Sequence, residues 1–182
     1  MLPVSVFISK EWRIGTDADK MKYQWTIIPA ASTDEAEIVA CAQAVGVFSA
    51  AEVATVAELF AGYMEDPQVS GYHFLVCRDA ERLYGFACWG PTDLTAGTAD
   101  LYWICTHPDA QGRGVARALF TTVEAAVQAI GRWQIVIWTG GKAEYLPAQR
   151  FYSQMQCQLV ARIPDYFAVG DDLCIYMRRW VA

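Results

Sequence analysis

The chain has 182 residues and is 54% hydrophobic and 19% charged, which fits one folded domain and excludes a disordered chain. Its formal net charge of −6, with no long run of Lys or Arg, argues against nucleic acid and anionic membrane surfaces as partners. The six cysteines show no C-x-x-C spacing and stand mostly in apolar runs, so they predict small buried side chains in a reducing compartment and no metal site.

Residues 1–22 are predicted to form an N-terminal extension, and residues 23–182 a single domain. The extension begins MLPVSVFISKEW, which lacks both the basic start of a signal peptide and the apolar length of a membrane span, so a cytoplasmic location is expected. The domain opens with a β-rich segment at 23–30, followed by two helices. The second helix begins after Ser49, and Glu52 three residues later completes a capping box.

Strands dominate the middle of the chain. The segments YHFLVC and RLYGFACW flank the polar RDAE and predict a hairpin. The segments ADLYWICT at 99–106 and WQIVIW at 133–138 are almost continuously apolar, which is typical of strands buried on both faces. A helix predicted between them, at 114–130, makes this part a right-handed parallel crossover.

A short helix in YLPAQRFYSQMQ and two strands, CQLVARI and DLCIYMRRW, complete the chain. The expected order of elements is therefore β-α-α-β-β-β-α-β-α-β-β. This order predicts an α/β fold, with one mixed sheet of about six to seven strands and helices on both of its faces.

The glycine-rich stretch Gln111–Ala116 is the most informative local pattern. A dinucleotide-binding fingerprint needs a third glycine where Arg117 stands, and the Gly-Lys-Ser/Thr of a Walker loop does not occur. A third interpretation is a turn whose backbone N–H groups bind a pyrophosphate, with Gly112 and Gly114 allowing close approach of the oxygen atoms. On the local pattern alone, a strand-to-helix connection without function explains this turn equally well.

The wider pattern resembles the GNAT superfamily of N-acetyltransferases. That family's acetyl-CoA segment runs from an apolar strand through x-Pro to Gln/Arg-x-x-Gly-x-Gly/Ala at the head of a helix, and this chain has LYWICTHP and then QGRGVA. A second family segment, Ala-x-x-(Leu/Phe)-Tyr-x-x-x-Gly-(Phe/Tyr), matches at Ala148, Phe151 and Tyr152. The chain departs from the family at Gln156, where Gly is usual, and at Tyr145, where Asn is frequent. The segments YLPAQRFY and DYFAVGDD resemble an uncharacterised GNAT subgroup.

The resemblance implies a GNAT-like domain that binds acetyl-CoA. In the family the strand before the glycine turn leaves backbone N–H groups free for the cofactor, and such buried groups would otherwise be unsatisfied. The cofactor-binding residues that the resemblance implies are Ile104, Cys105, Thr106, Gln111, Gly112, Arg113, Gly114, Val115, Ala116, Tyr145, Ala148 and Phe151.

Two residues are expected to move protons. Tyr152 matches the tyrosine with which the family often protonates the leaving thiolate, and its alternative role is that of a core aromatic. Asp100 stands where some family members carry a Glu base, and its alternative role is to bond the neighbouring loop GPTDLTAGT. Many family members use a chain of water molecules in place of a side-chain base.

The acceptor site is expected beside a late loop that often borders it in this fold. There Asp165 would bind a cationic acceptor, and Tyr166 and Phe167 would form a wall, with Phe48 and Trp103 opposite. The alternative roles of these residues are turn formation and core packing.

The expected function is transfer of an acetyl group from acetyl-CoA to a primary amine of a small molecule or peptide. The chain is thus expected to be a cytoplasmic acyltransferase, and the apolar last strand leaves a homodimer open. One alternative is a non-catalytic module that binds acyl-CoA, which the departures at Gln156 and Tyr145 favour. Another is acyl transfer with a different donor or an oxygen acceptor.

Overall fold

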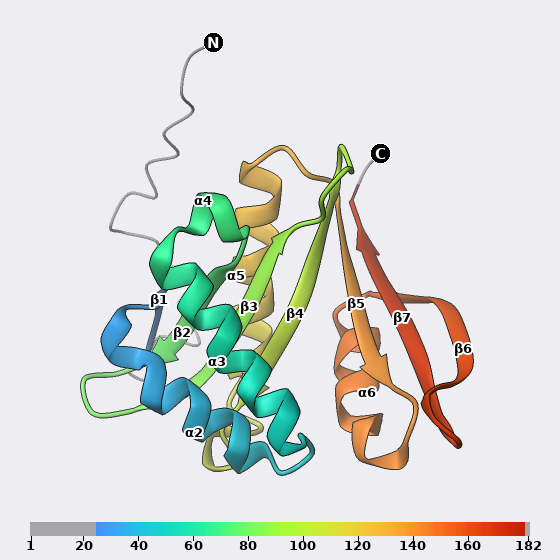
Figure 1. Cartoon of the computed structure of the whole chain (residues 1–182), viewed down its shortest axis with the longest axis horizontal. Coiled ribbons are helices and arrows are strands. Elements are labelled where there is room, and N and C mark those ends of the chain that lie inside the picture. The colour runs from blue at the N-terminus through green and yellow to red at the C-terminus, as the bar shows by residue number, and fades with distance from the viewer. Residues whose placement is uncertain (1–24, 181–182) are drawn as a thin grey trace.

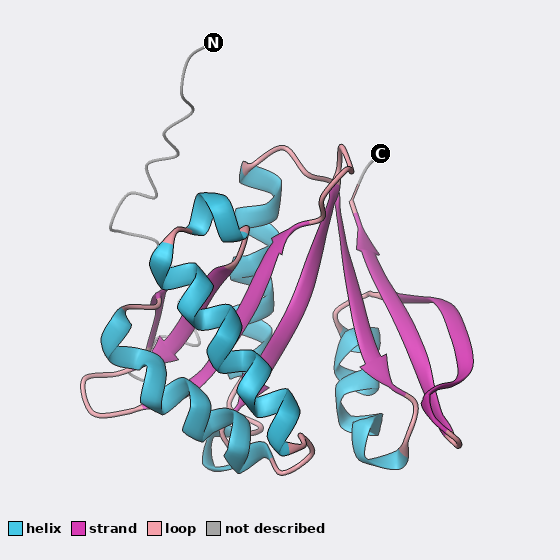
Figure 2. Ribbon diagram, viewed as in Figure 1, coloured by secondary structure: helices cyan, strands magenta, loops and turns pink. Residues whose placement is uncertain are grey.

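One open sheet of seven strands organises the chain (Figures 1 and 2). The computed structural model describes residues 25–180, so the predicted extension at 1–22 lies outside the described residues. The strands lie in the order β1-β2-β3-β4-β5-β7-β6, and only β4 and β5 are parallel neighbours. The strands are β1 Thr26–Pro29, β2 His73–Arg78, β3 Leu83–Pro91, β4 Thr98–Thr106, β5 Gln134–Gly140, β6 Gln158–Ala168 and β7 Asp171–Arg179.

The predicted order of elements and the α/β fold class are confirmed, with one addition. A short helix, α4, follows the second helix because Asp66 accepts a hydrogen bond from the N–H of Gln68 and Pro67 suits the first helical position. Within residues 25–180, no helix combines the length and the apolar character needed to cross a bilayer. The helices are α2 Glu35–Val45, α3 Ala50–Glu65, α4 Pro67–Ser70, α5 Val115–Ala129 and α6 Leu146–Gln154, with 3-10 turns η1 Ser32–Asp34, η2 Pro108–Ala110 and η3 Ala143–Tyr145.

Helices cover both faces of the sheet, as predicted. On one face α2 and α3 pack over the first strands, where Val56 and Phe60 share a buried core with Phe74 (Figure 1). On the other face α5 and α6 form a second core, in which Leu119 and Ile137 are fully buried. Burial of these apolar stripes is the main stabilising contribution. Every residue of β6 is exposed, so the sheet is thinly covered at this edge.

The start of α3 follows the sequence prediction. The Ser49 hydroxyl accepts a hydrogen bond from the N–H of Glu52 at 3.3 Å, and the Ser49 N–H donates to the Glu52 carboxylate at 2.7 Å. This reciprocal capping box fixes the N-terminus of α3 and hence the loop before it, which contains Phe48.

The parallel strands β4 and β5 separate soon after they meet. Their pairing runs only from Thr98↔Gln134 to Leu101↔Ile137, whereas β4 continues to Thr106 and β5 to Gly140. A bulge accompanies the separation, because Trp103 pairs with Cys88 and Leu101 with Trp89, which leaves Tyr102 as an extra residue in β4. The result is a V-shaped gap between β4 and β5, which Figure 1 shows opening toward the carboxyl ends of both strands.

The departure from the family pattern at Gln156 has a conformational meaning. This residue follows α6 and has a φ of 61°, in the left-handed region that favours glycine. Its side-chain oxygen accepts a hydrogen bond from Arg178 at 3.0 Å, and Arg178 also binds Glu124 at 2.8 Å. A side-chain bond therefore accompanies the unfavourable backbone conformation, in which a glycine would stand without strain.

This explanation predicts different stabilities for two substitutions at one position. Gln156→Ala and Gln156→Gly both lose the bond to Arg178, but only alanine keeps a Cβ in the left-handed conformation. We expect the glycine variant to have the larger free energy of unfolding, by about 1 kcal/mol, in urea denaturation. Equal stabilities of the two variants would contradict the left-handed conformation.

Candidate active site

The glycine turn leads into the N-terminus of α5. Gly112 and Gly114 have φ values of 73° and 83°, and a Cβ at either position would meet no atom within 4 Å, so conformation and not crowding requires glycine. His107 begins η2 before this turn, where its ring nitrogen accepts a hydrogen bond from the N–H of Asp109 at 3.3 Å. The turn therefore presents its backbone to open space at the head of a helix.

Several backbone N–H groups of this turn are available to a ligand. Among residues 25–180, the N–H groups of Gly112, Gly114 and the first three residues of α5, 115–117, make no main-chain hydrogen bond. The first bond of the helix is donated by Ala118 to the Gly114 carbonyl at 3.0 Å. Free N–H groups at a helix N-terminus form a site for an anion such as a phosphate. Val115 and Ala116 are among these residues, whereas the N–H of Gln111 is not free because it donates to the Pro108 carbonyl at 3.2 Å.

Arg113 belongs to the same turn and turns toward β3. It is close enough to Tyr84 to affect the pKa of that hydroxyl, which the hydrogen bond to Asp79 raises most strongly. Arg82 lies over the Tyr84 ring at 5.0 Å from its centroid. The positive charge beside the turn is thus shared by two arginines, of which sequence analysis predicted only Arg113.

The main chain of β4 alternates between its neighbour β3 and the gap. The N–H of His107 donates to the Tyr84 carbonyl at 2.9 Å, and antiparallel alternation therefore directs the main chain of Cys105 toward Phe86. Ile104 and Thr106 turn their N–H groups the other way, beyond the last pair with β5. Of the three predicted backbone donors, Ile104 and Thr106 thus face the gap, whereas Cys105 is held in the β3 ladder.

Side chains complete this part of the gap. The Cys105 thiol is buried, and burial raises its pKa well above the ordinary value. The Thr106 hydroxyl is buried without a hydrogen-bond partner among residues 25–180. The gap is therefore lined by neutral groups and by main-chain donors.

Tyr152 lies on α6 with its ring in the core beneath the gap. It is 6% exposed, and its ring centroid is 5.5 Å from that of Tyr176. Burial raises the pKa of the Tyr152 hydroxyl, and the nearby Cys105 of β4 adds to this effect. The hydroxyl thus stays protonated at neutral pH and lies close to β4, as a proton donor to a group in the gap requires.

The other predicted residues of this region frame α6. Ala148 and Phe151 pack against the core, with the Phe151 ring 5.9 Å from that of Phe120. Tyr145 ends η3 and covers Gly140 of β5, where a Cβ would meet its ring at 2.5 Å. Only glycine fits under this ring. Because Gly140 is the last residue of β5, Tyr145 stands at the open end of the gap.

Asp100 lies at the closed end of the gap, within the last stretch of pairing. Its neighbours Ala99 and Leu101 point into the core beneath α5, so strand alternation directs Asp100 to the opposite face. Its carboxylate accepts a hydrogen bond from the Thr92 hydroxyl at 2.7 Å, which is the loop contact that sequence analysis gave as the alternative role. Burial and then the nearby Asp100 carboxylate raise the pKa of Tyr102 to about 12.

Aromatic rings flank the gap on the face that carries Asp100. Trp103 of β4 packs against Phe48 in an edge-to-face contact of 4.8 Å, so two predicted acceptor residues meet. Across the gap, Trp138 of β5 meets Tyr166 at 6.1 Å, and Tyr166 meets Phe167 at 5.0 Å. Trp138 was not among the predicted site residues, and it directly follows Ile137, the last residue of β5 that pairs with β4.

The expectation of a late loop at Asp165, Tyr166 and Phe167 is wrong. All three belong to β6, and the turn to β7 comes later, at Val169 and Gly170. The Asp165 carboxylate accepts a hydrogen bond from the N–H of Gly170 at 2.6 Å, and the Asp165 N–H donates to Asp172 at 3.1 Å. These bonds tie Asp165 to its own hairpin, because its φ of 53° needs local support.

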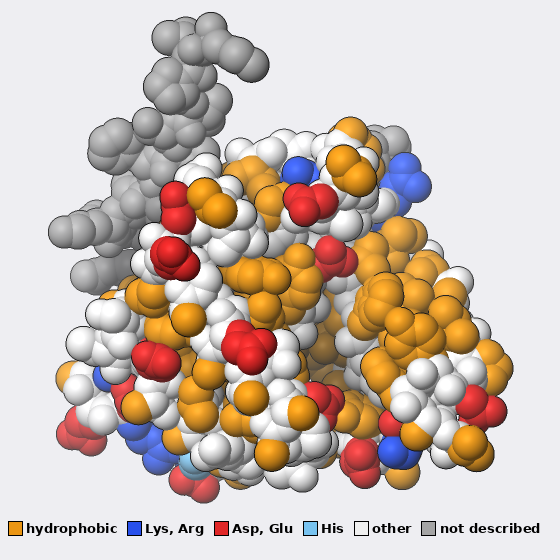
Figure 3. All heavy atoms as spheres, in the orientation of Figure 1, with side chains coloured by type: hydrophobic (Ala, Val, Ile, Leu, Met, Phe, Trp, Pro, Cys, Tyr) orange, Lys and Arg blue, Asp and Glu red, His pale blue; other side chains and the backbone are white. Residues whose placement is uncertain are grey.

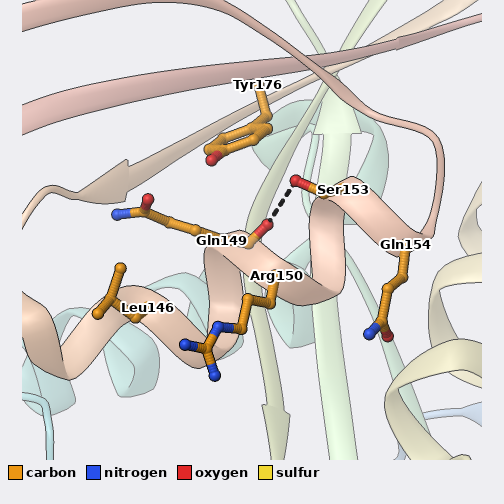
Figure 4. Close-up of a pocket in the computed structure, with 6 residues that line it drawn as sticks. All are labelled: Leu146, Gln149, Arg150, Ser153, Gln154 and Tyr176. Atoms are coloured by element: carbon orange, nitrogen blue, oxygen red, sulfur yellow. Dashed lines mark hydrogen bonds between the residues drawn. The ribbon is translucent and has the colours of Figure 1, made fainter.

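An open pocket of about 410 Å³ lies beside α6, outside the predicted site (Figure 4). In it the Ser153 hydroxyl donates to the Gln149 carbonyl at 3.0 Å, and Tyr176 of β7 lies across from the helix. Its lining consists of Leu146, Gln149, Arg150, Ser153, Gln154 and Tyr176. None of these lining residues is among the predicted site residues.

The site combines an anion-binding turn, a gap with free N–H donors, a buried protonated tyrosine and a carboxylate. No group of His, Cys, Asp and Glu suited to a metal ion occurs within residues 25–180. A long ligand with a phosphate at one end and a reactive acyl group at the other would fit this order of groups. The fold and the site thus fit an acyl-transfer domain built on a mixed sheet in which two parallel strands separate.

Comparison with known proteins agrees with this class. The family model "Acetyltransferase (GNAT) domain" matches residues 70–156, the span from β2 through α6. No curated protein matches the sequence of the chain. A solved structure from Desulfovibrio desulfuricans, assigned to the GNAT acetyltransferases, has 29% identity and a TM-score of 0.83 over 85% of this chain and 98% of its own. Residues 70–156 therefore match a GNAT acetyltransferase domain, as the sequence resemblance predicted.

More distant solved structures share the fold. The yncA protein of Salmonella typhimurium, solved with acetyl-CoA, has 22% identity and a TM-score of 0.68 over 86% of this chain and 94% of its own. An aminoglycoside 6'-N-acetyltransferase, solved with coenzyme A, has 12% identity and a TM-score of 0.69 over 86% and 97% of the two chains.

The anion-binding turn can be tested with two matched substitutions on one helix. Gly114→Glu places a carboxylate among the free N–H groups, whereas Gly131→Glu places one past the other end of α5. Both glycines have a positive φ and open surroundings, so the backbone cost is similar. We expect coenzyme A to raise the Tm of Gly131→Glu but not that of Gly114→Glu. A rise that both variants retain would refute the turn as the phosphate site.

Proposed function

We propose that the chain is an acetyl-CoA-dependent N-acetyltransferase that acts on a primary amine of a small molecule or peptide. The observation that carries the proposal is the gap between β4 and β5, with N–H donors free on one side, Tyr152 beneath it and Asp100 at its closed end. The GNAT domain match supports it, as do the acetyl-CoA and coenzyme A complexes of proteins with this fold.

Acetyl-CoA would supply the acetyl group as a thioester. The free N–H groups of Gly112, Gly114 and residues 115–117 would hold its phosphates, and Ile104 and Thr106 would donate hydrogen bonds to its arm. The same kind of main-chain donor stabilises negative charge on an oxygen during acyl transfer. These donors are fixed by the β3 ladder and by α5, so no rearrangement is needed to aim them.

The remaining chemistry is proton transfer. An alkylammonium has a pKa near 10.4, so the attacking amine must lose a proton near pH 7, and Asp100 would take it. The Tyr152 hydroxyl carries its proton at neutral pH and lies near Cys105 of β4, so it would give that proton to the departing sulfur. Gln156 adopts the left-handed conformation that glycine favours, which argues against reading this departure as the sign of a non-catalytic module.

Two further parts of the proposal concern the cell and the assembly. A cytoplasmic location is supported by six free and buried cysteines within residues 25–180. The last strand, β7, on which the expectation of a homodimer rested, lies inside the sheet between β5 and β6. A homodimer is supported instead by β6, an edge strand exposed along its whole length.

Tyr152→Phe tests the proton donor. We expect kcat to fall by about a hundredfold, while the rise in Tm with coenzyme A is retained, because only the hydroxyl is lost. The measurement is thiol release from acetyl-CoA at saturating amine. The matched control is Tyr176→Phe, a neighbouring ring whose hydroxyl faces the pocket by Ser153, and it should leave kcat nearly unchanged. An unaltered rate for Tyr152→Phe would show that this ring only packs.

Asp100→Asn tests the base through the pH dependence of the rate. The amide can still accept the bond from Thr92, but it cannot accept a proton from the amine. We expect kcat/KM to fall by about a hundredfold at pH 7, and the defect to shrink toward the pKa of the amine, near 10, where the free base is already abundant. Asp93→Asn in the adjacent loop is the control. A defect of constant size from pH 7 to 10 would refute a role as base.

A further inference from the structure

The groove in front of the gap has chemical features that narrow the class of acceptor. We call it the aromatic groove and define it by Phe48, Tyr72, Tyr102, Trp103, Trp138 and Tyr166. Figure 3 shows the molecule hollowed here, with hydrophobic side chains on both sides of the depression and acidic ones at its borders. The inference below rests on the proposed function.

Aromatic rings form both walls of the groove, and the rings of the wall on the β5 side are about half exposed. On the β5 side, Trp138 is 54% exposed and Tyr166 is 49% exposed, although they touch each other. On the β4 side, Tyr102 meets Tyr72 at 5.4 Å, and Trp103 meets Phe48. Large exposed rings on a surface facing a reactive site mark a place where an apolar ligand is covered.

The charges near the groove are negative at both ends. At the closed end, the charged groups that act on Tyr102 are Asp100 and Asp93. At the open end, those that act on Tyr145 are Glu52, Glu144 and Asp171.

The cations at the two ends of the groove are already engaged. Lys142 at the open end is held by Asp171 at 3.0 Å. At the closed end, Arg132 donates to the carbonyls of Thr95 and Thr98 at 2.8 and 2.9 Å. The cation–ring contact found within residues 25–180 lies elsewhere, where Arg82 covers Tyr84. A carboxylate or phosphate on the acceptor would therefore lose its hydration in the groove without gaining a cationic partner.

We infer that the acceptor is a small arylalkylamine, that is, an ammonium on a short chain attached to an aromatic ring, with no anionic group. Its ring would stack between the walls of the aromatic groove, and Asp100 would attract the ammonium before accepting its proton. Rings and a carboxylate together recognise such a cation through stacking, cation–π attraction and charge pairing. In the transfer, the ammonium first loses a proton to Asp100, which passes it to water. The free amine nitrogen then forms a bond to the acetyl carbon and the carbon–sulfur bond breaks. Sulfur receives a proton from Tyr152, and Tyr152 regains one through water from the second proton that the nitrogen loses.

A matched set of acceptors tests this class, with thiol release from acetyl-CoA as the readout. 2-Phenylethylamine carries both recognised features, phenylalanine adds a carboxylate, and putrescine keeps the charge without a ring. We expect kcat/KM for 2-phenylethylamine to exceed that for putrescine by at least about tenfold and that for phenylalanine by at least about a hundredfold. Preference for putrescine, for phenylalanine or for a short peptide would overturn the inference while leaving an acetyltransferase. No release with any amine, despite a rise in Tm with acetyl-CoA, would overturn the proposed function itself.

Variants of Trp138 connect the preference to the groove. Trp138→Ala should lower kcat/KM for 2-phenylethylamine by about tenfold and leave that for putrescine unchanged, because only the ring contact is lost. Trp138→Phe should restore most of the loss, and the rise in Tm with acetyl-CoA should be the same in both variants. Leu94→Ala, at a fully exposed residue of the β3–β4 loop, is the control. An equal loss for both amines in Trp138→Ala would show that this ring does not select the acceptor.

Discussion

The short parallel pairing of β4 and β5 is the constraint on which the site depends. Hydrogen bonds hold the two strands together as far as Leu101 and Ile137, and each then follows its other neighbour, β3 or β7. A gap inside a sheet leaves polar main-chain groups without partners, which is costly when they are buried. Here the two halves of the sheet are each supported by a core under α5 and α6, so the gap persists and its donors remain aimed into it.

The same separation organises the side chains. The side chains of Asp100 and Trp103 lie on one face of the sheet and that of Ile104 on the other. Asp100 and Trp103 share a face although they are three residues apart, because the bulge adds Tyr102 between them. One face of the gap thus receives aromatic rings and a carboxylate, and the other receives α5, α6 and Tyr152. Groups that act on the two partners of a transfer reaction can therefore approach from opposite sides of one sheet.

The order of elements could be predicted from the sequence, because apolar periodicity and Gly or Pro breaks are local signals. The glycine turn and Tyr152 were found through their motifs for the same reason. The extent of pairing between β4 and β5 could not be predicted, since both segments are apolar throughout and only their neighbours decide where they separate. The extended conformation at Asp165 was also missed, because a strand containing Pro164 and a left-handed residue resembles a loop in sequence.

Cys105 shows a consequence of burial that concerns side reactions. A thiol next to a bound thioester would ordinarily exchange with it and leave the acetyl group on the protein, but the attacking species in that exchange is the thiolate. Burial raises the pKa of Cys105 well above its ordinary value, so almost none of the thiolate is present at neutral pH. With a thioester in the gap, as we propose, the wall of the site is thereby protected from self-acylation, and the acetyl group is reserved for the acceptor.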